Sequence, residues 1–218
     1  MADYKKPDYW QQKARKEGYP ARSVYKLKEI DEKFNILRPA SKGRSLRILD
    51  LGAAPGSWSL LVLRKMTAGC FLAAADLSPL SREFDKGLFD SRNFFFVQGD
   101  ITAAQVRETL LAKGPYSAII SDAAPATTGS RTVDAARSLA LAEEVIAYAE
   151  IILPDGSPAL KPGGNLVVKV FQGGDSSALL MRMKTLFETA KSFKPQACRG
   201  ESVETYYVGI NRKNLAAG

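Results

Sequence analysis

The chain has 218 residues and a formal net charge of +8 at pH 7, and 45% of its residues are hydrophobic. These values are typical of a single soluble globular domain. The sequence contains no histidine and only two cysteines, Cys70 and Cys198, which excludes Ser-His-Asp and Cys-His catalysis, histidine-ligated zinc, a disulfide framework and a four-cysteine metal site. Acid–base chemistry therefore has to use Asp, Glu, Lys, Tyr or Cys, and no metal is expected.

The positive charge is concentrated near the N-terminus. Residues 1–48 contain 13 lysines and arginines against 6 acidic residues, whereas residues 49–218 contain 18 against 17. Cations that contact phosphates release counterions, so an acidic polymer such as RNA is the natural partner of this segment, with a solubilising tail as the alternative. The chain shows neither an apolar signal segment nor an apolar run of about 18 residues, which predicts a cytoplasmic protein without a membrane span.

The predicted elements form an alternating series after a polar start. A helix is expected from Ser23, which can cap it, to Pro39 and Gly43. Strands are then predicted at 46–51, 70–75, 94–97, 117–121 and 165–171, helices at 57–66, 80–90, 103–113, 133–153 and 176–190, and a terminal β-hairpin at 193–194 and 205–211. Alternating strands and helices, with near-continuous apolar strands, predict an α/β fold in which helices cover both faces of a parallel sheet.

Charged residues stand at the ends of the predicted strands. They are Asp50, Asp76, Asp100, Asp122 and Lys169. In an open parallel sheet, ligands bind beyond the carboxyl ends of the strands. These five side chains are therefore the first candidates for a binding site.

The turn after the first predicted strand indicates a nucleoside-containing cofactor. Residues 50–59 read DLGAAPGSWS, and glycines in such a turn let a ligand approach the backbone and the N-terminus of the next helix. Asp76 stands 20 residues beyond Gly56, at the position where a carboxylate accepts hydrogen bonds from a ribose diol.

The details of this turn favour S-adenosylmethionine over a dinucleotide. Gly52 and Gly56 form GxxxG, without the GxGxxG fingerprint. Asp50 would repel a pyrophosphate, but it suits the amino group and the sulfonium of S-adenosylmethionine. Asp100 is placed to accept from an adenine amino group. The simpler interpretation is a tight turn at the two glycines, with aspartates that cap helices.

Five motifs, in order along the chain, resemble the FtsJ/RrmJ family of ribosomal RNA 2′-O-methyltransferases. They are RSVYKL (22–27), DLGAAPGSWS (50–59), SDAAP (121–125), VKVFQG (168–173) and ETYYV (204–208). The resemblance implies a Rossmann-like methyltransferase fold with a mostly parallel seven-stranded sheet and a C-terminal antiparallel hairpin. We expect a basic RNA-binding extension and helix at 1–45, a methyltransferase domain at 46–213 and a tail at 214–218.

The resemblance also implies site residues. It assigns a catalytic tetrad to Lys26, Asp122, Lys169 and Glu204, and cofactor binding to Gly52, Pro55, Gly56 and Trp58 together with Asp50, Asp76, Asp100 and Asp122. Lys169 is expected to be the base that takes the proton of a ribose 2′-hydroxyl, with a pKa depressed by the nearby charge of Lys26. Asp122 and Glu204 would orient the two lysines. Without the resemblance, Lys26 reads as a solvated helix lysine, and the alternative role for Asp122, which ends a predicted strand, is to cap the following segment.

The expected substrate is a uridine ribose in 23S ribosomal RNA of the assembled large subunit, modified by a monomeric enzyme. Arg22 and Lys28 are candidate phosphate contacts, whereas Tyr9 and Trp10 either stack on bases or pack back on the domain. Three alternatives remain open: a transfer-RNA methyltransferase, a non-catalytic RNA-binding assembly factor and a nicotinamide-dependent oxidoreductase. The loop at 153–159 is longer than the family pattern leads us to expect.

Overall fold

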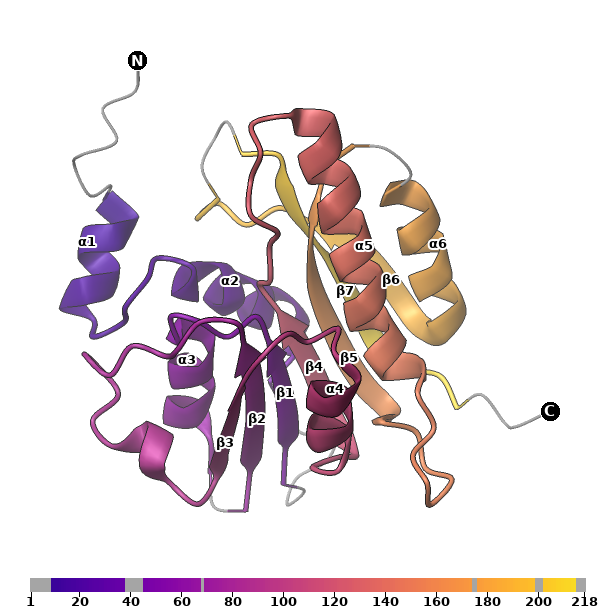
Figure 1. Cartoon of the computed structure of the whole chain (residues 1–218), viewed down its shortest axis with the longest axis horizontal. Coiled ribbons are helices and arrows are strands. Elements are labelled where there is room, and N and C mark those ends of the chain that lie inside the picture. Colours follow the sequence, from indigo (N-terminus) through magenta and orange to yellow (C-terminus); the bar gives the residue numbers. More distant parts are fainter. Residues whose placement is uncertain (1–8, 38–44, 68, 174–175, 199–201, 215–218) are drawn as a thin grey trace.

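Seven strands form one sheet in the order β3-β2-β1-β4-β5-β7-β6. The computed structural model describes residues 9–37, 45–67, 69–173, 176–198 and 202–214 (Figure 1). The strands are β1 Arg47–Leu51, β2 Phe71–Asp76, β3 Phe94–Gln98, β4 Tyr116–Ser121, β5 Leu160–Phe171, β6 Phe187–Phe193 and β7 Glu204–Arg212. Strands β1 to β5 pair in parallel, and β7 runs antiparallel to both β5 and β6. The predicted α/β fold and its C-terminal antiparallel hairpin are confirmed.

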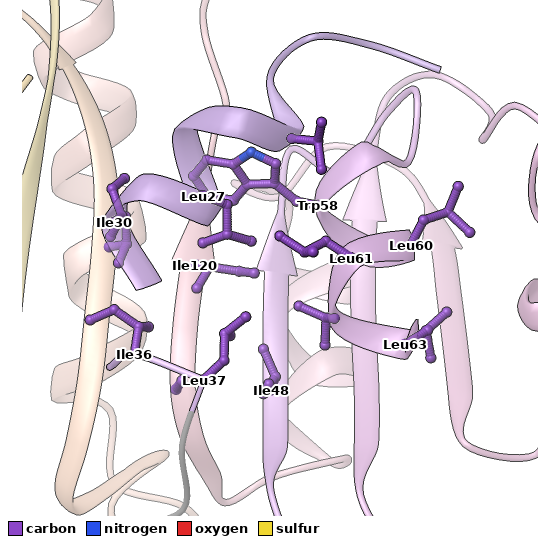
Figure 2. Packing of buried hydrophobic residues seen from close by; sticks show 14 of the residues in the cluster. Leu27, Ile30, Ile36, Leu37, Ile48, Trp58, Leu60, Leu61, Leu63 and Ile120 are labelled. Atoms are coloured by element: carbon purple, nitrogen blue, oxygen red, sulfur yellow. The ribbon is translucent and has the colours of Figure 1, made fainter. Parts of the chain in front are cut away.

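Helices cover the two faces of this sheet (Figure 1). They are α1 Tyr9–Lys16, α2 Val24–Phe34, α3 Ser57–Lys65, the short 3-10 helix η1 Leu88–Asp90, α4 Ala104–Leu111, α5 Arg131–Glu150 and α6 Ser176–Leu186. Figure 2 shows one core, in which Leu27 of α2 and Leu61 of α3 pack over Ile48 and Ile120 of the sheet. Helices α4, α5 and α6 bury their apolar residues against the other face. The N-terminal helices thus share a core with β1, the strand that leads into the turn predicted to bind a cofactor, which we call the cofactor turn.

Two predicted helices are corrected. The segment predicted as a helix at 80–90 contains only the three-residue η1, because Ser81 N–H donates to the carbonyl of Pro55 and Gly87 has a φ of +79°. The helix predicted at 176–190 ends at Leu186, and residues 187–193 are β6. Pairing with β7 overrides the local preference there, and Phe187 and Ala190 face the core.

Helix α1 was not predicted, because residues 9–16 are polar except for Trp10 and Ala14. The other predicted elements occur with boundaries that differ by a few residues. The long loop at 153–159 is a compact turn in which Asp155 accepts from the N–H and the hydroxyl of Ser157. The predicted helix end at Pro39 and Gly43, and most of the tail at 214–218, lie outside the described residues.

The topology brings distant segments to one edge of the sheet. Asp76 ends β2, Asp122 follows β4, and Lys169 lies near the end of β5. Strand β7 runs in the opposite direction, so its first residue, Glu204, pairs with Phe171 at the end of β5. Parallel pairing and one antiparallel strand therefore place all four segments at the same edge.

Candidate active site

Four charged side chains from four separate segments meet at the carboxyl edge of the sheet. Lys26 is the third residue of α2, Asp122 follows β4, Lys169 belongs to β5 and Glu204 begins β7. Lys26 Nζ lies 2.9 Å from Glu204 Oε2 and 3.9 Å from Asp122 Oδ1. Lys169 Nζ lies 3.0 Å from the same Asp122 oxygen and also donates to the main-chain carbonyl of Asp122. The Nζ atoms of the two lysines therefore share one carboxylate oxygen. Because the motif resemblance predicts that these four residues are catalytic, we call them the catalytic cluster.

The catalytic cluster is buried and balanced in charge. The side chains of Lys26 and Lys169 are each 8% exposed. Burial alone raises the pKa of Asp122, but the charges of Lys169 and Lys26 outweigh burial and hold that pKa below its usual value. Burial lowers the pKa of Lys26, but the charges of Asp122 and Glu204 outweigh it and raise the pKa. Asp122 is thus held as a carboxylate and Lys26 as an ammonium.

Tyr206 belongs to the same site, although the sequence analysis did not select it. Its hydroxyl donates to Asp122 Oδ1 at 2.6 Å, and Lys26 Nζ lies 5.8 Å from the centre of its ring. The side chain is fully buried, and burial raises its pKa well above the usual value. Residues two apart in a strand share a face, so the position of Tyr206 relative to Glu204 was a usable signal.

The turn between β1 and α3 approaches this cluster closely. Gly52 has a φ of +78°, and a Cβ atom at this position would lie 2.5 Å from the Cβ of Ala123. Gly56 has a φ of +110°, and its Cβ would lie 2.9 Å from the ring of Phe89. Only glycine combines this backbone conformation with so little space. The turn is thereby held against the residue that follows Asp122.

Asp76 holds the turn in place. Its Oδ2 accepts from the backbone N–H of Ala54 at 2.9 Å, and its Oδ1 accepts from that of Ser78 at 2.8 Å. The carboxylate is half-buried. Asp76 therefore reaches both the turn and the open edge of the sheet.

A cavity of about 110 Å³ opens beside the turn. It is lined by Gly52, Asp76, Leu77, Gly99, Asp100, Ile101, Ala123, Ala124 and Leu141. Three of the residues expected to bind the cofactor, Gly52, Asp76 and Asp100, line this cavity, and none of its lining residues is a lysine or an arginine. Hydrogen bonds from the backbone N–H and hydroxyl of Thr102 lower the pKa of Asp100, so this carboxylate is ionised. Two carboxylates beside apolar side chains fit the ribose and base of S-adenosylmethionine.

Asp50 lies in β1 and is fully buried. Its Oδ2 accepts from the hydroxyl of Ser59 at 2.7 Å, whereas its Oδ1 has no hydrogen-bond partner among the described residues. Burial raises the pKa of Asp50 to about 7, and the charges of Asp122 and Asp76 add to the effect. A buried carboxylate with an unused oxygen fits the cationic part of the same cofactor.

Five of the residues expected to bind the cofactor do not line the cavity: Asp50, Gly56 and Asp122, which are described above, and Pro55 and Trp58. Pro55 is exposed, and its carbonyl accepts from Ser81 N–H. The indole of Trp58 is 2% exposed and donates to the main-chain carbonyl of Ser23 at 2.8 Å. The first N–H groups of a helix have no acceptor within the helix, so Trp58 can offer its backbone N–H at the start of α3.

The candidate RNA-contacting residues lie around α1 and α2. Lys28 Nζ is 2.6 Å from Glu17 and lies over the rings of Tyr19 and Tyr25. The Trp10 ring packs on Tyr25 with a centroid distance of 5.0 Å, whereas Tyr9 is 69% exposed. The backbone N–H of Arg22 donates to Gln11. Trp10 thus packs back on the domain, and Tyr9 projects into solvent.

Two other kinds of feature are absent from the described part of the chain. No helix there has the length and apolar character to cross a membrane. Within the same residues, no group of three or more cysteines, aspartates and glutamates has a geometry that could hold a metal ion.

The chain is similar to known methyltransferases over most of its length. A family model described as FtsJ-like methyltransferase matches residues 19–212. A protein of Treponema denticola named ribosomal RNA large subunit methyltransferase E is 48% identical over 210 residues, which cover 96% of this chain and 97% of the relative. A protein of the same name from Oleidesulfovibrio alaskensis is 43% identical over 95% of this chain and 93% of the relative. A solved Plasmodium falciparum structure, assigned as a ribosomal RNA methyltransferase, shares the fold with a TM-score of 0.68 and 24% identity, over 89% of this chain and 98% of the other.

Proposed function

The chain belongs to the FtsJ-like methyltransferase family, as its five motifs predict, and from this membership we propose that it methylates the 2′-oxygen of a uridine ribose in large-subunit 23S ribosomal RNA. The methyl donor is S-adenosylmethionine. The RNA class is taken from the names of relatives that are 48% and 43% identical. The uridine, the 2′-oxygen and the assembled subunit are taken from the resemblance of the motifs. We expect a monomer that acts in the cytoplasm.

The observation that supports this proposal most strongly is the position of Lys169. Its Nζ lies 3.0 Å from Asp122 Oδ1, and the next residue, Ala123, is the one that Gly52 of the cofactor turn approaches. A nitrogen that can accept a proton therefore lies next to the place where the donor would bind. Methyl transfer to a hydroxyl needs this combination.

When bound, S-adenosylmethionine supplies a methyl group that is attached to a sulfonium sulfur. After the transfer, the rest of the molecule leaves as a neutral thioether. Asp76 and Asp100 bind its nucleoside, and the turn at Gly52 orients it toward the catalytic cluster. Lys169, in its unprotonated form, accepts the proton of the ribose 2′-hydroxyl as that oxygen attacks the methyl carbon. Asp122 orients Lys169, and Glu204 holds Lys26, which positions the ribose and its phosphate by charge.

The other acid–base candidates near the cluster are less suited to be the base. The raised pKa of Lys26 keeps it an ammonium. Burial raises the pKa of the Cys198 thiol to about 12, and the pKa of Tyr206 is also well above its usual value. All three side chains therefore keep their protons at neutral pH. This leaves Lys169 as the base we propose.

The test is a methyl-transfer assay with labelled S-adenosylmethionine. The acceptors are large subunits that lack the modification, free ribosomal RNA and transfer RNA, and the labelled nucleotide is mapped. We expect label on a ribose 2′-oxygen of one uridine in the subunits. Label on transfer RNA would show that transfer RNA, and not the large subunit, is the substrate. RNA binding without methyl transfer would indicate an assembly factor.

A second measurement addresses the oxidoreductase alternative. Thermal stability is compared with S-adenosylmethionine and with NAD. We expect only S-adenosylmethionine to raise the melting temperature, because Asp50 disfavours a pyrophosphate. A shift with NAD alone would contradict the proposed cofactor.

A further inference from the structure

Helix α3 is joined to the N-terminal segment by two side chains that the proposed reaction does not use. The Ser57 hydroxyl accepts from Ala21 N–H at 2.8 Å and donates to the Ala21 carbonyl at 3.1 Å. The indole Nε1–H of Trp58 donates to the Ser23 carbonyl at 2.8 Å. Ser57 is 1% exposed and Trp58 is 2% exposed. We call these three hydrogen bonds the 57–58 junction.

The junction connects the cofactor turn to the backbone that bears Lys26. On one side, Ser57 and Trp58 directly follow Gly56, the last residue of the turn. On the other side, the Ser23 carbonyl also accepts from the backbone N–H of Lys26 at 3.0 Å. One carbonyl oxygen therefore contacts both the Trp58 indole and the Lys26 backbone.

Trp58 contacts the catalytic cluster by a second route. Its ring lies 5.9 Å from that of Tyr206, whose hydroxyl donates to Asp122. Figure 2 shows Trp58 between α2 and α3, packed among the apolar residues of both helices. Buried hydrogen bonds of this kind have little freedom to shift, because water is not available to replace them. A displacement of the start of α3 is therefore expected to move the start of α2.

We infer that Ser57 and Trp58 are positioning residues, which transmit the bound state of the cofactor turn to Lys26. This inference rests on the proposed function. A cofactor that contacts the first turn of α3 would hold the backbone of these two residues, and the junction would then hold residues 21–26. Binding of the methyl donor would thereby hold Lys26 more rigidly in its position within the catalytic cluster.

The test uses Trp58→Phe and Ser57→Ala. Phenylalanine keeps an aromatic ring beside Tyr206 but removes the donor and the volume of the second indole ring, and the Ser23 carbonyl retains the N–H of Lys26. We expect kcat for methyl transfer to fall between about 10- and 100-fold in each variant, since small misplacements of reacting groups have effects of this size. The dissociation constant for S-adenosylmethionine should stay within about twofold, since the side chains lie outside its cavity.

Tyr116→Phe is the matched control. Its hydroxyl also is a buried donor to a main-chain carbonyl, that of Leu110, but Tyr116 begins β4 at the opposite edge of the sheet. We expect its kcat to be unchanged. Normal kcat in both junction variants would overturn the inference, as would an equal loss in the control. Should Trp58→Phe fail to fold, Ser57→Ala decides alone.

Hydrogen exchange separates this inference from the proposed function. In the wild type, adding S-adenosylmethionine should slow exchange of the backbone N–H groups in residues 21–26, and in Ser57→Ala it should not. This readout needs no RNA, so it decides the inference even if the proposed RNA substrate is wrong. Cofactor binding without slower exchange in the wild type would refute the junction. Absence of cofactor binding would refute both proposals.

Discussion

The catalytic cluster and the cofactor cavity lie side by side, but they differ in how their charges are paired. In the cluster, Lys26 lies 2.9 Å from Glu204, and Lys169 lies 3.0 Å from Asp122. On the cofactor side, Asp50, Asp76 and Asp100 accept hydrogen bonds only from backbone N–H groups and hydroxyls in the described chain. No lysine or arginine is among the residues that line the cavity.

This difference has a physical consequence. Charges buried together with their partners keep a defined geometry. A buried carboxylate without a cation instead has a raised pKa, as Asp50 has through burial and, to a smaller extent, through the charges of Asp122 and Asp76. The cluster is therefore organised before any ligand binds, whereas the cofactor side is completed by a ligand that brings positive charge.

The largest expected effect comes from removing the proposed base of the cluster. Lys169→Met keeps the aliphatic stem in β5 and removes the nitrogen. We expect methyl transfer to fall about 100- to 10,000-fold, the usual contribution of a positioned base. Cofactor affinity, measured by calorimetry, should change by less than about threefold, because Lys169 does not line the cavity.

The control for this variant is Lys161→Met, in the same strand but eight residues earlier, near its amino end. Its activity should match the wild type. Normal activity in Lys169→Met would contradict the proposed base, and the cluster would then not be the part of the site that carries out proton transfer.

A smaller effect is expected on the cofactor side. Asp76→Asn keeps the shape of the side chain but removes its charge. The charged carboxylate accepts a hydrogen bond from Ala54 N–H and would accept hydrogen bonds from the ribose. We expect the dissociation constant for S-adenosylmethionine to rise about 10- to 100-fold, as for lost hydrogen bonds to a charged group. The rate at saturating cofactor should change much less. Asp155→Asn, whose carboxylate likewise accepts from the N–H two residues on, is the control and should bind normally.

The two sites could not be predicted equally well from the sequence. The cofactor side is local: Gly52, Gly56, Asp76 and Asp100 lie in turns at the ends of successive parallel strands, so strand order alone brings them together. The cluster is not local, because Lys26 and Glu204 are separated by most of the chain and reach the same edge through α2 and the antiparallel β7. Only the family resemblance assigned those two, and Tyr206 was missed.

The fold shows the same division. Apart from the helix predicted at 80–90, the alternating strands and helices from β1 to β5 follow from apolar periodicity and turn residues, and they were predicted within a few residues. Strand β6 could not be predicted locally, because its residues 187–193 are extended only by pairing with β7. Helix α1 depends similarly on contacts of Trp10 and Ala14 with distant residues.

The smallest expected effect concerns the unpaired charge of Asp50. Folding raises its pKa from the usual value near 4 to about 7, so the folded chain binds this proton more tightly than the unfolded chain. Stability is then lost as pH rises from about 4 to about 7. Asp50→Asn removes this loss, which corresponds to about 4 kcal/mol in the free energy of unfolding. The amide that replaces the carboxylate is incompletely hydrogen-bonded, however, and this offsets about 1–3 kcal/mol of the gain.

We therefore expect Asp50→Asn to be more stable than the wild type at pH 8 by about 1–3 kcal/mol, with the difference shrinking toward pH 5. Urea unfolding at both pH values measures it. Asp134→Asn is the control of opposite sign: backbone N–H groups of Thr128 and Gly129 lower the pKa of Asp134, so this variant should be less stable by a constant amount across that range. Saturating S-adenosylmethionine should reduce or reverse the advantage of Asp50→Asn, because its positive charge stabilises the ionised Asp50 of the wild type. An advantage that is independent of both pH and cofactor would mean that Asp50 is not the unpaired charge on this side of the site.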